Sequence, residues 1–185
     1  MIHHLMTGPA KRQYTFRDYE QLPEGAPYQL IGGELTLTPS PTFDHQEVLY
    51  NLAGKLRHFV AEKQLGKAVG APIDVYLSDH EVYQPDIIFI SNERINIISE
   101  RVRGVPDMVM EIVSPSTGYY DLVQKKRTCE QSGVREYWIV DPQEKLIEVH
   151  WNIGQEFKLV SKARICGLVS SQLLTGFTID LNSLF

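Results

Sequence analysis

The stretch PDMVMEIVSPST, residues 106–117, has the pattern of a buried strand followed by a helix start, but Glu111 interrupts its apolar run. The stretch VYQPDIIFI, residues 82–90, repeats this pattern with Asp86. Both stretches are apolar on each face, as is typical of central strands that are covered on two sides. An ionised carboxylate that is left uncompensated in such a place costs several kcal/mol. The two acids are therefore the first candidates for a functional role.

The surrounding sequence predicts an alternation of helices and strands. Residues 42–65 form a helix because apolar side chains recur there at helical spacing, and Gly66 ends it. A second helix begins after Ser116 or Thr117 and ends at Gly133. The core order is helix, three strands, helix, strand, which indicates an α/β domain with a mixed sheet flanked by helices. We expect strands at residues 67–78, 82–90, 106–113 and 136–142, preceded by a short helix at 15–23 and a hairpin at 28–41 around Gly32-Gly33, and followed by strands at 145–151, 157–161 and 176–185.

Length, composition and charge narrow the class of protein. The 185 residues predict a single domain over residues 14–185 after a flexible N-terminus, residues 1–13. No apolar run reaches the roughly 18 residues of a membrane-spanning helix, and the N-terminus lacks the apolar core of a signal peptide. The two cysteines are far apart and indicate no disulfide framework, which suits a reducing compartment. We therefore expect a cytoplasmic protein without membrane association. The net charge of −5 argues against nucleic-acid binding by bulk electrostatics.

The two acids can serve one site. By strand alternation, Asp86 shares a face with Gln84, and Glu111 shares a face with Val109. If the strands are neighbours, both carboxylates point into one cleft, where their mutual repulsion would raise a pKa. A divalent cation removes this penalty, and hard oxygen ligands with open water positions suit Mg²⁺ or Mn²⁺. The alternative for either acid is an ion pair with an arginine or a bond to a backbone amide at a strand end.

Several stretches resemble one nuclease family. Pro85-Asp86 followed by Glu111-Ile112-Val113 is similar to the PD-(D/E)XK motif of the restriction-endonuclease-like superfamily, whose core has the order α-β-β-β-α-β. Within that superfamily the chain resembles the Uma2 family of endonucleases, from about Tyr14 to Trp151. The resemblance implies a restriction-endonuclease-like fold with an extra N-terminal hairpin and extra C-terminal strands. The stretches that carry it are YQLIGGEL, SPTFDHQEVLYNL, QPDIIFI, GVPDMVMEIVSPST, DLVQKK and GVREYWIVDP.

The resemblance also implies the composition of a metal site. Asp86 and Glu111 would bind Mg²⁺ or Mn²⁺ together with the backbone carbonyl of Ile112. The lysine position of the superfamily is Val113 in this chain, and valine has no acid–base or electrostatic function. The Uma2 pattern takes its lysine from the following helix, where Lys125 stands. If that helix packs on the strand of Glu111, Lys125 extends its ammonium into the cleft.

Three further residues are candidates for supporting roles. His45 begins the apolar stripe of the first long helix and so faces the sheet, either as a metal ligand or as a hydrogen-bonded core residue. Asp121 lies one helical turn before Lys125, and the alternative for this pair is a solvent-exposed ion pair worth a few tenths of a kcal/mol. Glu34, after the Gly-Gly turn, matches the Uma2 pattern.

These features predict a Mg²⁺-dependent endonuclease that hydrolyses phosphodiester bonds of nucleic acid, with DNA as the expected substrate. Gln29 and Cys129 stand where the Uma2 pattern often has glutamate and tyrosine, and with Val113 they bear on whether this chain is active. One alternative is a catalytically inactive nuclease-fold module that binds nucleic acid or a protein. Another is a dimerisation domain that pairs through an exposed sheet edge. Sequence recognition by the enzyme would depend on a homo-oligomer or on another protein.

Overall fold

The computed structural model describes residues 13–113 and 119–185, and for residues 119–121 it describes the main chain alone. Nearly all of the predicted flexible N-terminus, residues 1–13, lies outside the described residues. The predicted start of the second helix at Ser116 or Thr117 lies outside them as well. Within the described part of the chain, no helix is long and apolar enough to cross a membrane.

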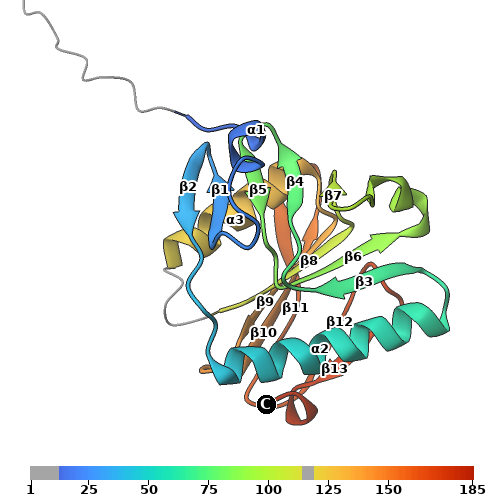
Figure 1. Ribbon diagram of the computed structural model, residues 1–185. Helices are drawn as coiled ribbons and strands as arrows, with labels where there is room; N and C mark the ends of the chain where they lie inside the picture. Colours follow the sequence, from blue (N-terminus) through green and yellow to red (C-terminus); the bar gives the residue numbers. More distant parts are fainter. Residues whose placement is uncertain (1–12, 114–118) are drawn as a thin grey trace, which may run out of the picture.

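The core of the molecule is a six-stranded mixed sheet (Figure 1). β8 and β9 run parallel, whereas the other neighbouring pairs are antiparallel. The residues of β6 and β8 are almost all buried, as expected of central strands that are covered on both faces. The strands in spatial order are β11 (Phe157–Arg164), β10 (Leu146–Asn152), β9 (Glu136–Asp141), β8 (Met108–Ile112), β6 (Ile87–Ser91) and β3 (Gly66–Gly70).

Two long helices cover this sheet. α2 (Phe43–Glu62) buries a stripe of apolar side chains against one face, where it packs on Met108 and Met110 of β8. α3 (Tyr119–Ser132) packs on the other face, which carries Val109 and Tyr137, through Cys129. β12 (Leu168–Ser170), β13 (Thr178–Asp180) and the 3₁₀ turn η2 (Leu181–Ser183) complete the α2 side. The alternation of β8 side chains between two separate clusters shows that each face has its own helix.

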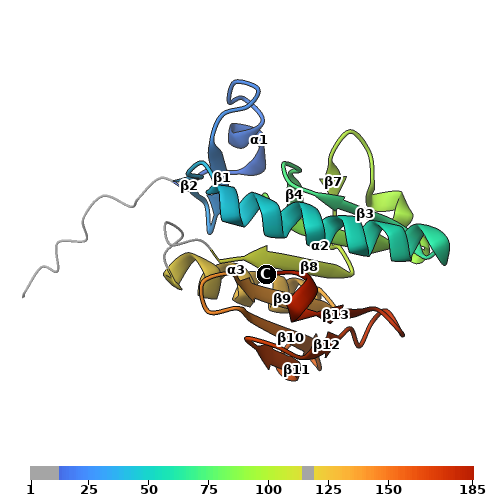
Figure 2. The ribbon, with the colours of Figure 1, turned by 90° about the horizontal axis from the view of Figure 1, so that it is seen from below.

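A second, five-stranded sheet lies on the N-terminal side of the molecule. Figure 2 shows its hairpin and α1 on one side of α2, and strands β10 to β13 on the other side. The sheet has its own small core around Leu30, Tyr76 and Val82. Its strands in spatial order are β2 (Glu34–Leu37), β1 (Tyr28–Ile31), β5 (Glu81–Tyr83), β4 (Val75–Ser78) and β7 (Val102–Arg103), and the short helix α1 (Phe16–Tyr19) accompanies it. The 3₁₀ helix η1 (Asn92–Ile97) follows β6 and contacts β3 and β6 of the six-stranded sheet.

Two of the predicted strands are wrong in one respect, because each is divided between the two sheets. Residues 67–78 become β3 and β4, and residues 82–90 become β5 and β6. Pro72 and Pro85 lie at the two crossings, where a residue without an amide hydrogen cannot extend a ladder. Asp86 therefore lies at the corner between the sheets, and strand alternation does not place it on one face with Gln84.

Candidate active site

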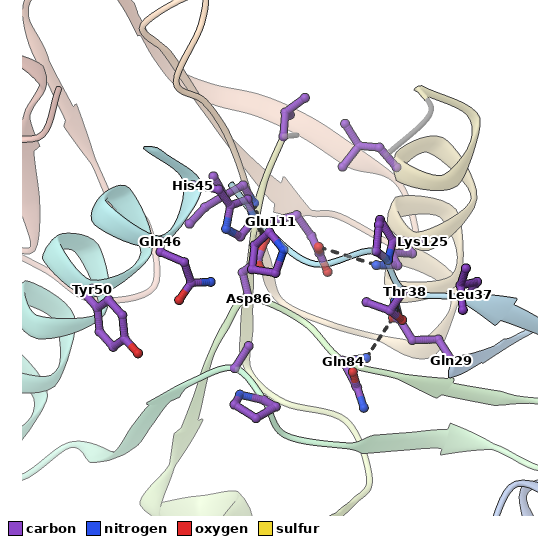
Figure 3. A pocket seen from close by; sticks show the side chains of 17 residues that line it. Gln29, Leu37, Thr38, His45, Gln46, Tyr50, Gln84, Asp86, Glu111 and Lys125 are labelled. Carbon is purple, nitrogen blue, oxygen red and sulfur yellow. Dashed lines mark hydrogen bonds and ion pairs between the residues drawn. The ribbon is translucent and has the colours of Figure 1, made fainter. Parts of the chain in front are cut away.

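The two acids meet where β6 begins and β8 ends. The antiparallel register pairs Ile87 of β6 with Met110 of β8, so one further step places Asp86 opposite Glu111. Both carboxylates line the same cavity, which has a volume of about 430 Å³ and opens between α2 and the β1–β2 hairpin (Figure 3). The expected neighbouring strands are confirmed. The corner at Asp86 and the end of β8 bring the two acids together.

Asp86 is held by the main chain and by α2. Its Oδ2 accepts a hydrogen bond of 2.7 Å from the backbone amide of Ile112, the last residue of β8. The same oxygen lies 3.3 Å from Nε2 of His45, in the first turn of α2. Thr42 caps this helix by accepting a hydrogen bond from the His45 amide. The prediction that His45 faces the sheet is confirmed, because its side chain is buried.

Glu111 faces the helix on the other side of the sheet. Nζ of Lys125, in α3, lies 3.7 Å from Glu111 Oε2, and both side chains are almost completely buried. Lys125 and Cys129 are one helical turn apart, and both belong to the buried face of α3. Val113, at the lysine position of the superfamily motif, also lines the cavity. An ammonium group from α3 thus lies beside the second acid (Figure 3).

The charges of the cavity compensate one another. Burial has the largest single effect and lowers the pKa of His45, but Asp86, Glu111 and the main chain of Ile112 together raise it above its ordinary value of 6.5. Lys125 supplies a second positive charge beside Glu111. The basic side chains of His45 and Lys125 thus offset the desolvation cost of the two nearly buried carboxylates.

The donors in the cavity fit a hard divalent cation. Asp86, Glu111 and Ile112 line one cavity, and carboxylate and main-chain carbonyl oxygens are the ligands that Mg²⁺ and Mn²⁺ prefer. Nδ1 of His45 is buried and has no hydrogen-bond partner among the described residues. Across residues 13–113 and 119–185, no three His, Cys, Asp or Glu side chains form a preassembled metal group. A cation would therefore need the main chain and water as further ligands.

The chain is similar to a known protein family and to a solved structure. The family model of Uma2, described as "Putative restriction endonuclease", matches residues 16–182. The chain belongs to the Uma2 family. A solved structure similar to this Uma2 chain is the crystal structure of a "putative nuclease belonging to DUF820" from Anabaena variabilis ATCC 29413. The two chains are 21% identical, 92% of this chain and 97% of the other are covered, and the TM-score is 0.78. At this identity the likeness shows the fold, and the expected restriction-endonuclease-like core is confirmed. No curated protein matches this chain.

One predicted supporting residue, Glu34, does not line this cavity, and the position of another, Asp121, stays a prediction. Glu34 is the first residue of β2, is exposed, and does not line the cavity. Asp121 belongs to the first turn of α3, but its side chain lies outside the described residues. Gln29, where the Uma2 pattern often has glutamate, does line the cavity. Its amide donates to Thr38 and accepts from the Gln84 amide, so it joins the β1–β2 hairpin to the corner before Asp86.

Sequence reasoning missed the walls of the cavity. Tyr50 and Gln46 of α2 line one wall, and Leu37 and Thr38 lie across from them (Figure 3). Gln46 and Tyr50 are one helical turn apart, directly beside the face that carries His45. The sequence feature that could have indicated this wall is Tyr50, an aromatic residue on the otherwise polar side of α2.

Other buried acids are structural. Asp107 accepts a hydrogen bond from the Ser91 amide and lies 3.4 Å from Arg94 and from Arg135. Glu136 accepts hydrogen bonds from an indole, a hydroxyl and two backbone amides. Neither residue lines the cavity. Asp107 and Glu136 have the kinds of partner, arginines and backbone amides, that the sequence left open as the alternative for Asp86 and Glu111.

Proposed function

We propose that this Uma2 protein is a divalent-metal-dependent endonuclease that hydrolyses phosphodiester bonds, with DNA as its substrate. The observation that carries the proposal is that Asp86 and Glu111, from adjacent strands, line one cavity together with the ammonium group of Lys125. The family to which the chain belongs is described as a restriction endonuclease family, which supports the same reaction class.

Each residue has a defined part in this reaction. Asp86, Glu111 and the Ile112 carbonyl would hold Mg²⁺ or Mn²⁺, which when bound acidifies water and stabilises negative charge on phosphate. Hydrolysis forms a bond from the water oxygen to phosphorus and breaks the bond from phosphorus to a sugar oxygen, which leaves with a proton. Lys125 would orient the attacking water and offset charge on the phosphate.

His45 would act beside Asp86. As a neutral imidazole it would join the metal shell, and as an imidazolium it would contact the scissile phosphate. In the metal-free protein the pKa of His45 is raised, and its Nε2 is the nitrogen that faces Asp86. A bound cation would oppose a proton on Nε2, because both compete for the same carboxylate.

Cleavage of a supercoiled plasmid and of oligonucleotides in Mg²⁺ or Mn²⁺ tests the proposal. We expect Asp86→Ala and Glu111→Ala to lose at least about a hundredfold of the cleavage rate. Glu148→Gln is the matched control, because Glu148 is a partly buried acid on the same sheet outside the cavity, and it should retain activity. Full activity in both Asp86→Ala and Glu111→Ala would refute the assignment.

One observation favours a second function, a catalytically inactive module that binds nucleic acid or a protein. The motif lysine is replaced by Val113, and the two acids already have basic partners within the chain, so the fold does not require a cation. This alternative predicts a wild-type protein that leaves both substrates intact in Mg²⁺ and in Mn²⁺ but still binds its partner.

A further inference from the structure

The walls of the cavity differ in chemistry from its floor. The floor carries the acids and their basic partners, whereas most of the remaining surface is apolar. The apolar part comes from the segment after the β1–β2 hairpin, from α2, from the crossing between the sheets and from α3. Its principal residues are Leu37, Pro39, Pro41, Tyr50, Pro72 and Leu122. At about 430 Å³, the cavity falls within the size range of pockets that enclose small organic groups.

The described residues that line this cavity include few of the positive charges that bind a duplex by its backbone. Proteins hold double-stranded DNA largely by lysine and arginine contacts to phosphates. Among the described residues that line the cavity, Lys125 is the only lysine or arginine, and it faces Glu111. The formal net charge of the whole chain is −5. Contacts other than lysine and arginine pairing with phosphates would therefore add to the affinity for nucleic acid at this site.

Tyr50 offers such a contact. Its side chain lines the cavity although the residue is 70% exposed, so the ring is accessible to a ligand. Gln46, one turn earlier on α2, lines the same wall and brings an amide that both donates and accepts hydrogen bonds. Aromatic rings stack on unpaired bases of any sequence, and each such contact is worth about 1–3 kcal/mol. Leu37 and Thr38 bound the opposite side (Figure 3).

We propose that this site takes its substrate as an unpaired nucleotide. The base lies in the apolar part of the cavity against Tyr50, and the adjoining phosphodiester reaches Asp86 and Glu111 on the floor. This inference rests on the proposed nuclease function, because it assigns the substrate class of that same site. Single-stranded nucleic acid enters directly, whereas a duplex must first unstack a nucleotide at a cost of a few kcal/mol.

Fluorescence anisotropy in EDTA tests this proposal without requiring cleavage. The probes are a short fluorescein-labelled oligothymidine and the same strand annealed to oligodeoxyadenosine. We expect the single strand to bind at least about tenfold more tightly than the duplex. Tyr50→Ala should weaken single-strand binding by about tenfold, and Tyr50→Phe, which keeps the ring, should restore it.

Phe43→Ala is the matched control for Tyr50→Ala. Phe43 is a 77% exposed aromatic residue on the same helix, and it does not line the cavity. We expect its loss to leave single-strand affinity unchanged. Duplex binding as tight as single-strand binding, an unaltered affinity in Tyr50→Ala, or binding of neither probe would each overturn the inference.

The two proposals fail in different ways. Single-strand preference that depends on Tyr50, in a protein that cleaves nothing in Mg²⁺ or Mn²⁺, supports the unpaired-nucleotide site and overturns the nuclease. Metal-dependent cleavage that is faster on duplex than on single strand, with no effect of Tyr50→Ala, supports the nuclease and overturns the unpaired-nucleotide site.

Discussion

Two clusters of ionisable residues lie on either side of α3, and each contains a histidine, a lysine of that helix and a carboxylate. The cavity cluster consists of His45, Asp86, Glu111 and Lys125. The outer cluster consists of Lys126, Glu148, His150 and Lys162. Two consecutive residues of one helix thus enter different clusters. The comparison shows how nearly identical groups acquire different properties from their neighbours.

The sheet determines the spacing of the two clusters. Glu111 of β8, Ile139 of β9 and Glu148 of β10 are paired in register, so the two carboxylates stand in one row separated by Ile139. Neighbouring strands are about 4.8 Å apart, which places the acids roughly 10 Å from each other along the row. Consecutive helical residues point about 100° apart. Lys125 therefore reaches the β8 side and Lys126 reaches the β10 side.

The two histidines show that burial alone does not decide a charge. His45 and His150 are each only 7% exposed. Burial has the largest single effect and lowers both pKa values, but the neighbouring acids Asp86 and Glu111, with the main chain of Ile112, reverse this effect at His45 and raise its pKa. At His150 the positive charge of Lys126 adds to burial, and the pKa is lowered despite Glu148.

The largest expected effect separates the adjacent lysines by activity. Lys125→Met should reduce metal-dependent cleavage by about a hundredfold, because it removes the positive charge proposed to orient the attacking water and to offset charge on the phosphate. Lys126→Met should change the rate less than about threefold, since Lys126 contacts His150 outside the cavity. Single-turnover cleavage of an oligonucleotide measures both rates. Equal losses in the two variants would remove the functional distinction between the clusters.

A smaller effect separates the same two lysines by stability. Lys125→Met leaves Glu111 nearly buried without the ammonium group that faces it, and should lower the free energy of unfolding by about 3 kcal/mol. Lys126 is partly exposed and lies beside a histidine, so Lys126→Met should cost less than about 1 kcal/mol. Urea unfolding of the metal-free variants measures the difference. If both variants unfold at the same urea concentration, the Lys125–Glu111 pair is not a buried ion pair.

The smallest expected effect concerns the free energy of unfolding, to which the two histidines contribute with opposite pH dependences. The His45 contribution to stability is present below its ordinary pKa of 6.5 and is lost as the pH rises through its raised pKa, because the folded state binds the extra proton. The His150 contribution is present above 6.5 and is lost as the pH falls through its lowered pKa.

Unfolding measured on both sides of pH 6.5 checks these signs. Replacing His45 by glutamine should remove a stabilisation seen at the lower pH, and replacing His150 by glutamine should remove one seen at the higher pH. If both substitutions changed the pH dependence of the free energy of unfolding in the same direction, the neighbouring charges would not control the pKa values of these histidines.

The sequence predicted most elements but not the corner on which the site depends. Periodicity located the helices and the buried strands, because each element has an apolar face of regular spacing. It joined β5 to β6 because both halves are apolar, and only the three-dimensional pairing shows that Pro85 ends one ladder before Asp86. The choice between Lys125 and Lys126 came from the Uma2 resemblance, since spacing alone does not say which lysine a packed helix buries. Periodicity did not identify Tyr50, because a single exposed aromatic residue on a helix is not part of a regularly spaced apolar face.

Calorimetric titration with Mn²⁺ tests most directly whether Asp86 and Glu111 share one cation. The predicted result is one site per chain in the wild-type protein and in Glu148→Gln, and no site in Asp86→Asn or Glu111→Gln. Manganese binding of undiminished affinity and stoichiometry in Asp86→Asn would contradict the account.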